Sequence, residues 1–275
     1  MVACNEQELK QLKQDCLNLR QRIVELSYKA GKNGAHVGGC LSLVEILRAL
    51  MEVLNRDPQN FEDRDRLILS KGHGALALYC ALEQKGILTK EEADTFETNG
   101  TDYFAHAKRN IEKGIEFSGG SLSLGLSYAV GVALGCKAKQ LDNHIYVIIG
   151  DGECDEGLVW ESLMAASKYK LDNMTVIVDC NGLQSDGFTK DIMDTSLLSD
   201  KFTAFGFDVA EVEGHDVAAI LNTLKKKIIM PQTIIAHTVK GKGVSFVEND
   251  PKWHHGVMSD KLYEQAKEEL SQYEI

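Results

Sequence analysis

The sequence has few of the features that mark linkers, leader peptides or membrane spans. Its 275 residues include only three prolines, at positions 58, 231 and 251. There is no Pro/Ser-rich stretch and no internal repeat, so we expect a single domain over residues 1–275. No apolar run approaches the roughly 18 residues that a membrane span needs. The polar segment 5–8 predicts that no signal peptide is present, and we expect a cytoplasmic protein that contacts no membrane.

Cysteine is present but is not arranged for cross-linking or for zinc. The seven cysteines form no C-x-x-C pair, and their number is odd. A disulfide framework and a structural zinc site are therefore excluded. We interpret the cysteines as small apolar core residues in a reducing compartment.

Positive charge is also scarce. Thirty Lys and Arg residues face 41 Asp and Glu residues, which gives a formal net charge of −11. A nucleic-acid or anionic-membrane surface needs clustered basic residues, and the longest lysine run covers only positions 225–227. We expect no nucleic-acid partner.

What the sequence does contain is an alternation of short apolar runs and amphipathic stretches. Strands are expected at 145–149, 174–178 and 233–236, with a weaker one at 207–212, and a short apolar run covers 67–69. Helices are expected over the first thirty residues and at 41–54, 75–84, 90–97, about 124–136, 156–169, 217–228 and 259–270. Continuous apolar strands are typical of a sheet that is covered on both faces. The alternation predicts an α/β fold of three α/β/α layers around a mainly parallel sheet.

Ligands of such sheets bind beyond the carboxyl ends of the strands, so the loop after strand 145–149 is the first candidate site. Gly150 and Gly152 allow a tight turn and a close approach of a ligand to the backbone. A helix that begins at about Asp155 would direct free N–H groups at a diphosphate. Asp151 beside that anion implies a divalent cation between them. A plain turn with a solvated aspartate stays an open alternative for this loop taken alone.

The next strand ends at a second candidate loop, thirty residues further on. Asn181 offers an amide oxygen there, and Leu183 offers a backbone carbonyl. A right-handed crossover brings the two loops to the same edge of the sheet. Asp151, Asn181 and the Leu183 carbonyl, together with two phosphate oxygens and a water, would give Mg²⁺ its six oxygen ligands.

These two loops resemble the thiamine-diphosphate binding motif, in which G-D-G is followed about thirty residues later by asparagine. The usual ending is Asn-Asn, and here it is Cys180-Asn181. Glu156-Gly157 after the first loop resembles the transketolase form of the motif. The resemblance implies thiamine diphosphate as the cofactor and Mg²⁺ as the metal, with Ca²⁺ or Mn²⁺ left open.

Four histidines lie in segments that are similar to transketolase motifs. His36 lies in an N-G-x-H-x-G loop, His73 ends R-D-R-x-x-L-S-x-G-H, and His106 precedes G-x-E-x-x-x-G-x-L at 114–122. His255 matches the family's W-H-G, although His254 competes for this role. A single histidine is more often structural, and we interpret His144, His215 and His237 in that way. The set of four favours a catalytic site around the cofactor and the sugar.

The resemblance covers about residues 10–260 and implies a set of cofactor-binding residues. These are His73, Gly120, Leu122, Gly150, Asp151, Gly152, Glu153, Glu156, Asn181 and His255. Glu156 and Glu161 also match family glutamates at a subunit interface, and a solvated helix face is the alternative.

Transketolases are more than twice as long as this chain, and their second domain provides the glutamate that protonates the cofactor. The resemblance therefore implies an N-terminal subunit that needs a C-terminal transketolase subunit, in an α₂β₂ assembly. The implied reaction moves a two-carbon ketol unit from a ketose phosphate to an aldose phosphate. A specialised sugar transketolase, an enzyme similar to deoxyxylulose-phosphate synthase, and a non-catalytic cofactor-binding scaffold stay as alternatives. The sugar pair is not predicted.

Overall fold

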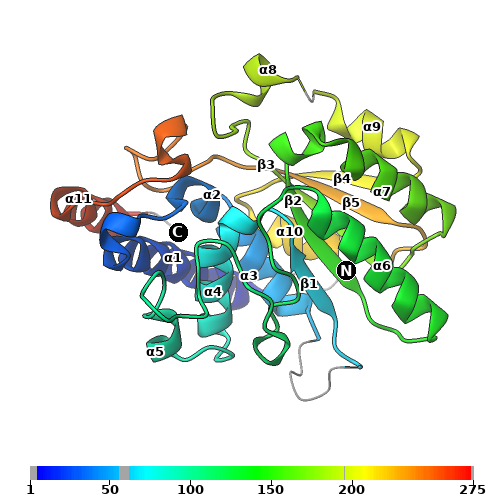
Figure 1. The fold of residues 1–275 in the computed structure, drawn as a ribbon, viewed down its shortest axis with the longest axis horizontal. Helices are drawn as coiled ribbons and strands as arrows, with labels where there is room; N and C mark the ends of the chain where they lie inside the picture. The colour runs from blue at the N-terminus through cyan, green and yellow to red at the C-terminus, as the bar shows by residue number, and fades with distance from the viewer. Residues whose placement is uncertain (1–4, 56–61, 195, 274–275) are drawn as a thin grey trace.

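A five-stranded parallel sheet forms the centre of the protein (Figure 1). The computed structural model describes residues 5–55, 62–194 and 196–273. The strand order is β1-β2-β3-β5-β4. The strands are β1 (Arg66–Leu69), β2 (Ile145–Gly150), β3 (Met174–Cys180), β4 (Asp208–Glu213) and β5 (Gln232–His237). The four predicted strands are confirmed, with ends that differ by at most two residues, and the apolar run 67–69 forms most of β1.

Helices cover both faces of the sheet, and each face has its own apolar core (Figure 1). One core packs against α1 (Glu6–Lys29), α2 (Val37–Leu41), α3 (Val44–Val53), α4 (Ala75–Gln84), α5 (Lys90–Ala93), α10 (Val217–Leu224) and α11 (Asp260–Ser271). The other packs against α6 (Leu124–Ala138), α7 (Gly157–Lys168) and α9 (Leu198–Ala204). The short α8 (Thr189–Ile192) lies in the loop between β3 and α9. The predicted three-layer α/β/α class is confirmed.

Alternating side chains of each central strand enter opposite cores. In β2, Tyr146 and Ile148 pack in the first core, and Ile145, Val147 and Ile149 pack in the second. Because both faces are buried, each position favours an apolar residue, which explains the continuous runs in the sequence. The edge strand β4 is half exposed, which explains why its pattern is weaker.

The register of the sheet brings three loops to one edge. Gly150 is paired with Asp179, and Cys180 is paired with His237. The chain therefore leaves β2, β3 and β5 at nearly the same level. The segments that begin at Asp151, Asn181 and Thr238 consequently start side by side.

Several predicted helix boundaries are wrong, mostly where glycine or a turn interrupts the apolar pattern. The 41–54 helix is α3, which begins at Val44, and the glycine-rich segment before it contains the separate helix α2. The 90–97 helix ends at Ala93, and the 217–228 helix ends at Leu224 before the lysine run. Helices α8 and α9 are absent from the sequence-based prediction, although Leu198 and Phe202 are an apolar pair at helical spacing.

The described cysteines carry free thiols, as predicted. Five are buried, and Cys180 is half-buried, while Cys4 lies outside the described residues. Among the helices of the described ranges, none has both the length and the apolar character to cross a bilayer.

Candidate active site

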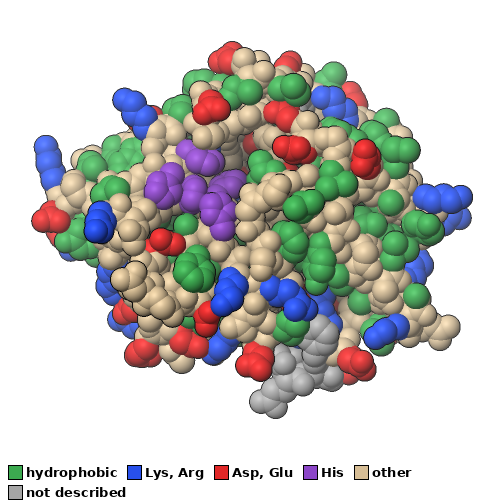
Figure 2. All heavy atoms as spheres, in the orientation of Figure 1, with side chains coloured by type: hydrophobic (Ala, Val, Ile, Leu, Met, Phe, Trp, Pro, Cys, Tyr) green, Lys and Arg blue, Asp and Glu red, His purple; other side chains and the backbone are tan. Residues whose placement is uncertain are grey.

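A cavity of about 270 Å³ lies at the carboxyl edge of the sheet, beyond β2 and β3. The rest of its wall comes from the segments after β1 and β5, the loop before α6 and the 251–256 segment. Ten of the sequence-predicted residues line it: His73, His106, Gly120, Leu122, Gly150, Asp151, Gly152, Glu153, Asn181 and Leu183. Figure 2 shows the histidine side chains grouped in one hollow of this face.

The two predicted loops are in direct contact through Asp151. Its Oδ2 accepts a hydrogen bond from the Gly182 amide at 2.7 Å and one from Thr189 Oγ1 at 3.2 Å. Its Oδ1 accepts from the Gly152 amide at 3.0 Å. Burial raises the pKa of the Asp151 carboxyl, and the nearby Asp179 carboxylate raises it further. A positive ion at this position would offset both effects.

Asn181 and Leu183 lie in the same loop, and both already have protein partners. Asn181 donates to Asp179 Oδ2 at 3.1 Å, and its side-chain oxygen accepts from the Leu183 amide at 3.1 Å. The Leu183 carbonyl, which the sequence suggested as a metal ligand, accepts from Lys240 Nζ at 3.0 Å. Both oxygens keep a second lone pair.

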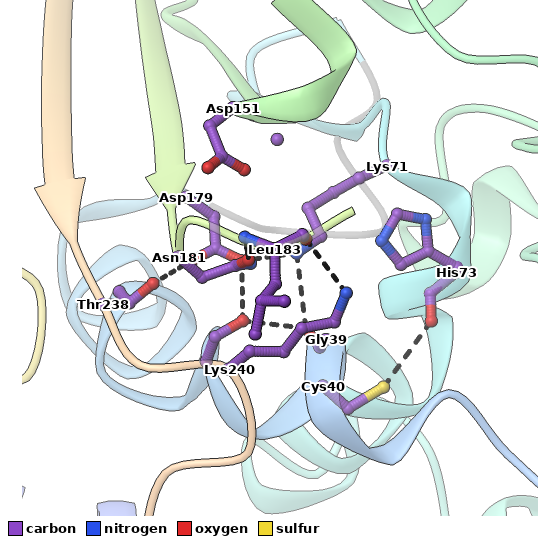
Figure 3. Close-up of polar contacts among 12 residues, drawn as sticks. Gly39, Cys40, Lys71, His73, Asp151, Asp179, Asn181, Leu183, Thr238 and Lys240 are labelled. Carbon is purple, nitrogen blue, oxygen red and sulfur yellow. Dashed lines mark hydrogen bonds and ion pairs between the residues drawn. The ribbon is translucent and has the colours of Figure 1, made fainter. Parts of the chain in front are cut away.

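Two buried lysines, Lys71 and Lys240, line the cavity (Figure 3). Lys71 forms an ion pair with Asp179, which also accepts from Ser42 and Thr238. Lys240 is 2% exposed, and its partners within the described ranges are two backbone carbonyls and the His254 ring at 3.1 Å, none of them a carboxylate. Burial, and then the charge of Lys71, lower the pKa of Lys240 to about 8. An anionic ligand would provide the missing counter-charge.

The histidines form one cluster with His36 at its centre. The His36 ring centroid lies 5.8 Å from that of His73, 5.1 Å from His106, 5.4 Å from His254 and 4.7 Å from His255. Burial and the neighbouring His255 lower the pKa of His36 to about 3. Burial also lowers the pKa of His73 and of His106. These rings are therefore neutral near pH 7, so the lysines provide the positive charge.

Of the two neighbouring histidines that competed for one role, His254 lines the cavity and His255 does not. The His254 ring contacts both His36 and His73, whereas His255 is exposed and its ring contacts His36. Burial, and then Lys240, lower the pKa of His254 to about 4. His36 does not line the cavity itself, but its buried Nδ1 has no hydrogen-bond partner among the described residues.

Glu153 lines the cavity, and its carboxylate is hydrogen-bonded to three segments of the cavity wall. Its carboxylate accepts from the Ser123 amide at 2.7 Å, the Gly150 amide at 3.1 Å and the Ser70 hydroxyl. These contacts tie the loop after β2 to the segment before α6. Ser123 adopts a left-handed conformation with φ of 71°, so this segment depends on such bonds.

The expected helix N-terminus lies further along the chain than predicted. A 3₁₀ turn covers Gly152–Asp155, and α7 begins only at Gly157. The first turn of α7 does not line the cavity, whereas Gly150 and Gly152 do. Glu161 is exposed on α7, and Glu156 is the exposed N-cap of that helix. Neither lines the cavity, although Glu156 was expected among the cofactor-binding residues.

The residues of the cavity fit a diphosphate with a divalent cation. Asp151 is a buried carboxylate whose pKa is raised, and Lys240 is a buried ammonium without a carboxylate partner among the described residues. In the part of the chain that the structure describes, no group of three or more His, Cys, Asp or Glu side chains is arranged to hold a metal ion. A cation here would therefore need mixed oxygen ligands, including phosphate oxygens, as Mg²⁺ usually has.

The sequence analysis did not single out Lys71, Lys240, Gln184 or Ser185, which also line the cavity. Lys71 directly precedes Gly72-His73 in one of the motifs that resemble transketolase. Lys240 lies in the loop after β5, which leaves the sheet at the same edge as the two candidate loops. A lysine followed directly by glycine in that loop was the available signal.

Comparison with known proteins defines the class of domain. The family model described as "Transketolase, thiamine diphosphate binding domain" matches residues 14–273. The transketolase of Campylobacter jejuni has the same fold, with a TM-score of 0.86 and 30% identity over 95% of this chain and 43% of that one. This is a thiamine-diphosphate-binding domain.

Two relatives of similar length are more similar in sequence. An apulose-4-phosphate transketolase subunit of Phocaeicola vulgatus is 41% identical over 92% of this chain and 91% of its own. The 6-deoxy-6-sulfo-D-fructose transketolase subunit of a Clostridium species is 41% identical over 87% and 90%. Human transketolase is 31% identical, and the match covers 43% of its length. The chain belongs to the transketolase family.

Proposed function

We propose that this chain binds the diphosphate of thiamine diphosphate, through a divalent cation, as one half of a two-chain transketolase. The observation that supports this most directly is the contact between the loops after β2 and β3. It places Asp151 and the Asn181 loop on one cavity, with Lys71 and Lys240 beside them. The proposed cation is Mg²⁺, and Ca²⁺ or Mn²⁺ would satisfy the same oxygen ligands.

Each group in the cavity has a proposed part in this function. Asp151, the Asn181 side-chain oxygen and the Leu183 carbonyl hold the cation, and Lys240 neutralises the phosphate. Bound thiamine diphosphate supplies the nucleophilic carbon that ketol transfer requires. His36, His73, His106 and His254 or His255 are donors and acceptors that orient sugar hydroxyls and move protons between them.

The reaction that we propose is the transfer of a two-carbon ketol unit from a ketose phosphate to an aldose phosphate. A C-terminal transketolase subunit would complete the site, because this chain spans only 43% of the matched full-length enzymes. Relatives of this chain's length that are named as transketolase subunits support such a partner. An α₂β₂ assembly, in which each cofactor contacts both chains, is our proposal for the complex.

A specialised sugar is the second candidate for the substrate. The two relatives that are 41% identical to this chain are named for apulose 4-phosphate and for 6-deoxy-6-sulfo-D-fructose. Human transketolase is less similar, at 31% identity. The partner chain would decide between these sugars and common pentose phosphates.

A titration and a mixing experiment test the proposal. Calorimetry of the assembled complex with thiamine diphosphate should detect binding only when a divalent cation is present. The chain alone should show no ketol transfer, and addition of the partner should produce it with one of the sugars above. Absence of cofactor uptake by the complex, or turnover by the chain alone, would contradict the proposal.

A further inference from the structure

Segment 239–242 carries Lys240, whose side chain lines the cavity. Away from the cavity, the backbone of this segment is hydrogen-bonded to two largely buried side chains. The Val239 amide donates to His215 Nε2 at 2.8 Å. The Lys242 carbonyl accepts from Arg20 Nε at 3.1 Å. The residues on both sides of the lysine are thus held by groups that do not line the cavity.

Glu45 joins those two groups into one network. Its carboxylate accepts from both terminal nitrogens of Arg20, at 2.6 and 2.8 Å, and lies 2.9 Å from His215 Nδ1. The side chains of Arg20, Glu45 and His215 are 1%, 6% and 12% exposed. Burial raises the pKa of Glu45, but the Arg20 charge and the hydrogen bonds from His215 and Arg20 together lower it below its usual value, so the carboxyl stays ionised.

The network also fixes the orientation of the histidine ring. Nε2 accepts the Val239 N–H, so the ring proton must lie on Nδ1, where it is donated to Glu45. An ionised carboxylate favours this tautomer, and the bidentate Arg20 holds the carboxylate in place. The hydrogen bond to Val239 therefore depends on Glu45 and Arg20 as well as on His215.

Close packing leaves the segment little room for any other path. Gly241 has φ of 87°, and a Cβ there would lie 2.5 Å from the Val247 carbonyl oxygen. At Gly243, with φ of 94°, a Cβ would lie 3.1 Å from the Arg20 side chain. On the cavity side, the Lys240 side chain passes 3.1 Å from the Cβ position of Gly38. A shift of the segment would therefore move the Lys240 ammonium.

We propose that Arg20, Glu45 and His215 are positioning residues that hold segment 239–242 so that the Lys240 ammonium faces the diphosphate position. The statement about the diphosphate rests on the function proposed above. The hold on the segment itself does not, because its hydrogen bonds join only residues of this chain.

The test compares three variants of the full 275-residue chain. His215→Leu removes the acceptor and keeps an apolar side chain, and His215→Gln restores an acceptor. Arg48→Leu is the matched control, since Arg48 ties α3 to Asp15 of α1, as Arg20 and Glu45 tie the same two helices, but does not contact segment 239–242. Amide hydrogen exchange of Val239 is measured without ligand, and affinity is measured with thiamine diphosphate plus Mg²⁺ on the assembled complex.

His215→Leu should speed exchange at Val239 and weaken cofactor affinity, each roughly tenfold, as expected for the loss of one buried hydrogen bond. His215→Gln should stay within about threefold of the parent, and Arg48→Leu should lower the melting temperature without either local effect. The inference would be overturned if His215→Leu kept the exchange rate at Val239 and the cofactor affinity of the unmutated chain. It would also be overturned if His215→Gln changed both quantities as much as His215→Leu. If the unmutated chain and its complex bind no cofactor, the proposed function fails, while the exchange data still decide whether the network holds the segment.

Discussion

The Gly182 amide donates a hydrogen bond to Asp151 Oδ2 at 2.7 Å, across 31 residues of sequence. This bond closes one edge of the cavity and fixes the loop after β3 against the loop after β2. It also leaves the negative charge of Asp151 without a cationic partner in direct contact among the described residues. The hydrogen bond thus holds the two loops together, and the negative charge of Asp151 is available to a cationic ligand.

Replacing that charge should separate cofactor binding from folding. Asp151→Asn keeps the size of the side chain and removes the charge, so we expect thiamine diphosphate affinity in the presence of Mg²⁺ to fall by about 100-fold, a loss of roughly 2.7 kcal/mol. Calorimetry on the assembled complex measures this. Asp172→Asn, which changes a surface partner of Lys137, is the control and should bind like the parent. Equal affinity in both variants would show that Asp151 holds no cation.

Lys71 should be a strong determinant of stability. Lys71→Ala leaves the fully buried Asp179 without its cation, and breaking a buried ion pair in this way costs about 3–5 kcal/mol. Urea unfolding measures the loss. Lys137→Ala breaks the exposed pair with Asp172 and should cost less than about 1 kcal/mol. Similar losses in the two variants would contradict the assignment of Asp179 as a buried carboxylate that needs Lys71.

Gly119 should be intolerant of any side chain. A Cβ at Gly119 would lie 2.7 Å from the Cα of Gly72, so backbone would have to move against backbone. We expect Gly119→Ala to cost about 1–3 kcal/mol and to weaken cofactor binding, because the adjacent Gly120 and Leu122 line the cavity.

The control for this substitution is Gly131→Ala. Gly131 lies within α6, and a Cβ there meets no atom within 4 Å. Alanine should raise helix stability by up to about 1 kcal/mol without a change in cofactor affinity. Thermal unfolding of both variants, followed by cofactor titration, measures the contrast. Equal stabilities would mean that the Gly72–Gly119 approach relaxes freely.

The buried histidines should make the ligand-free protein sensitive to acid. Burial lowers the pKa of His36 to about 3 and of His254 to about 4, below the value of about 6.5 in an unfolded chain. Below about pH 6.5 the unfolded state binds protons that the folded state does not, so stability falls as the pH falls towards 4. Each such group contributes up to about 1.4 kcal/mol per pH unit.

Urea midpoints at about pH 7.5, 6.5 and 5.5 measure this loss, because they bracket the titration of an unfolded histidine. His36→Asn removes one of the groups and should flatten the curve in this range, whereas substitution of the exposed His237 serves as the control. A parental slope in His36→Asn would show that His36 is not a neutral buried ring in the folded protein.

The sheet and the two loops that carry Asp151 and Asn181 could be predicted from the sequence, because they depend on the local pattern of apolar residues. A strand that is buried on both faces needs a continuous apolar run, and Ile145–Ile149 and Met174–Val178 supply one each. The loops that follow the strands are then set by topology, which placed Asp151 near Asn181. Helix ends were less predictable, because caps such as that of α7 depend on a turn that the apolar spacing does not encode.

The sequence by itself determined the strands, the edge at which the loops meet and the residue types available there. Only the tertiary structure decided which of them converge: that His254 rather than His255 lines the cavity, that Lys240 lies buried against the Leu183 carbonyl, and that His215 supports the Lys240 segment. The physical reason is that these contacts join residues far apart in the chain. Their geometry depends on how two cores pack across the sheet, and no local propensity specifies it.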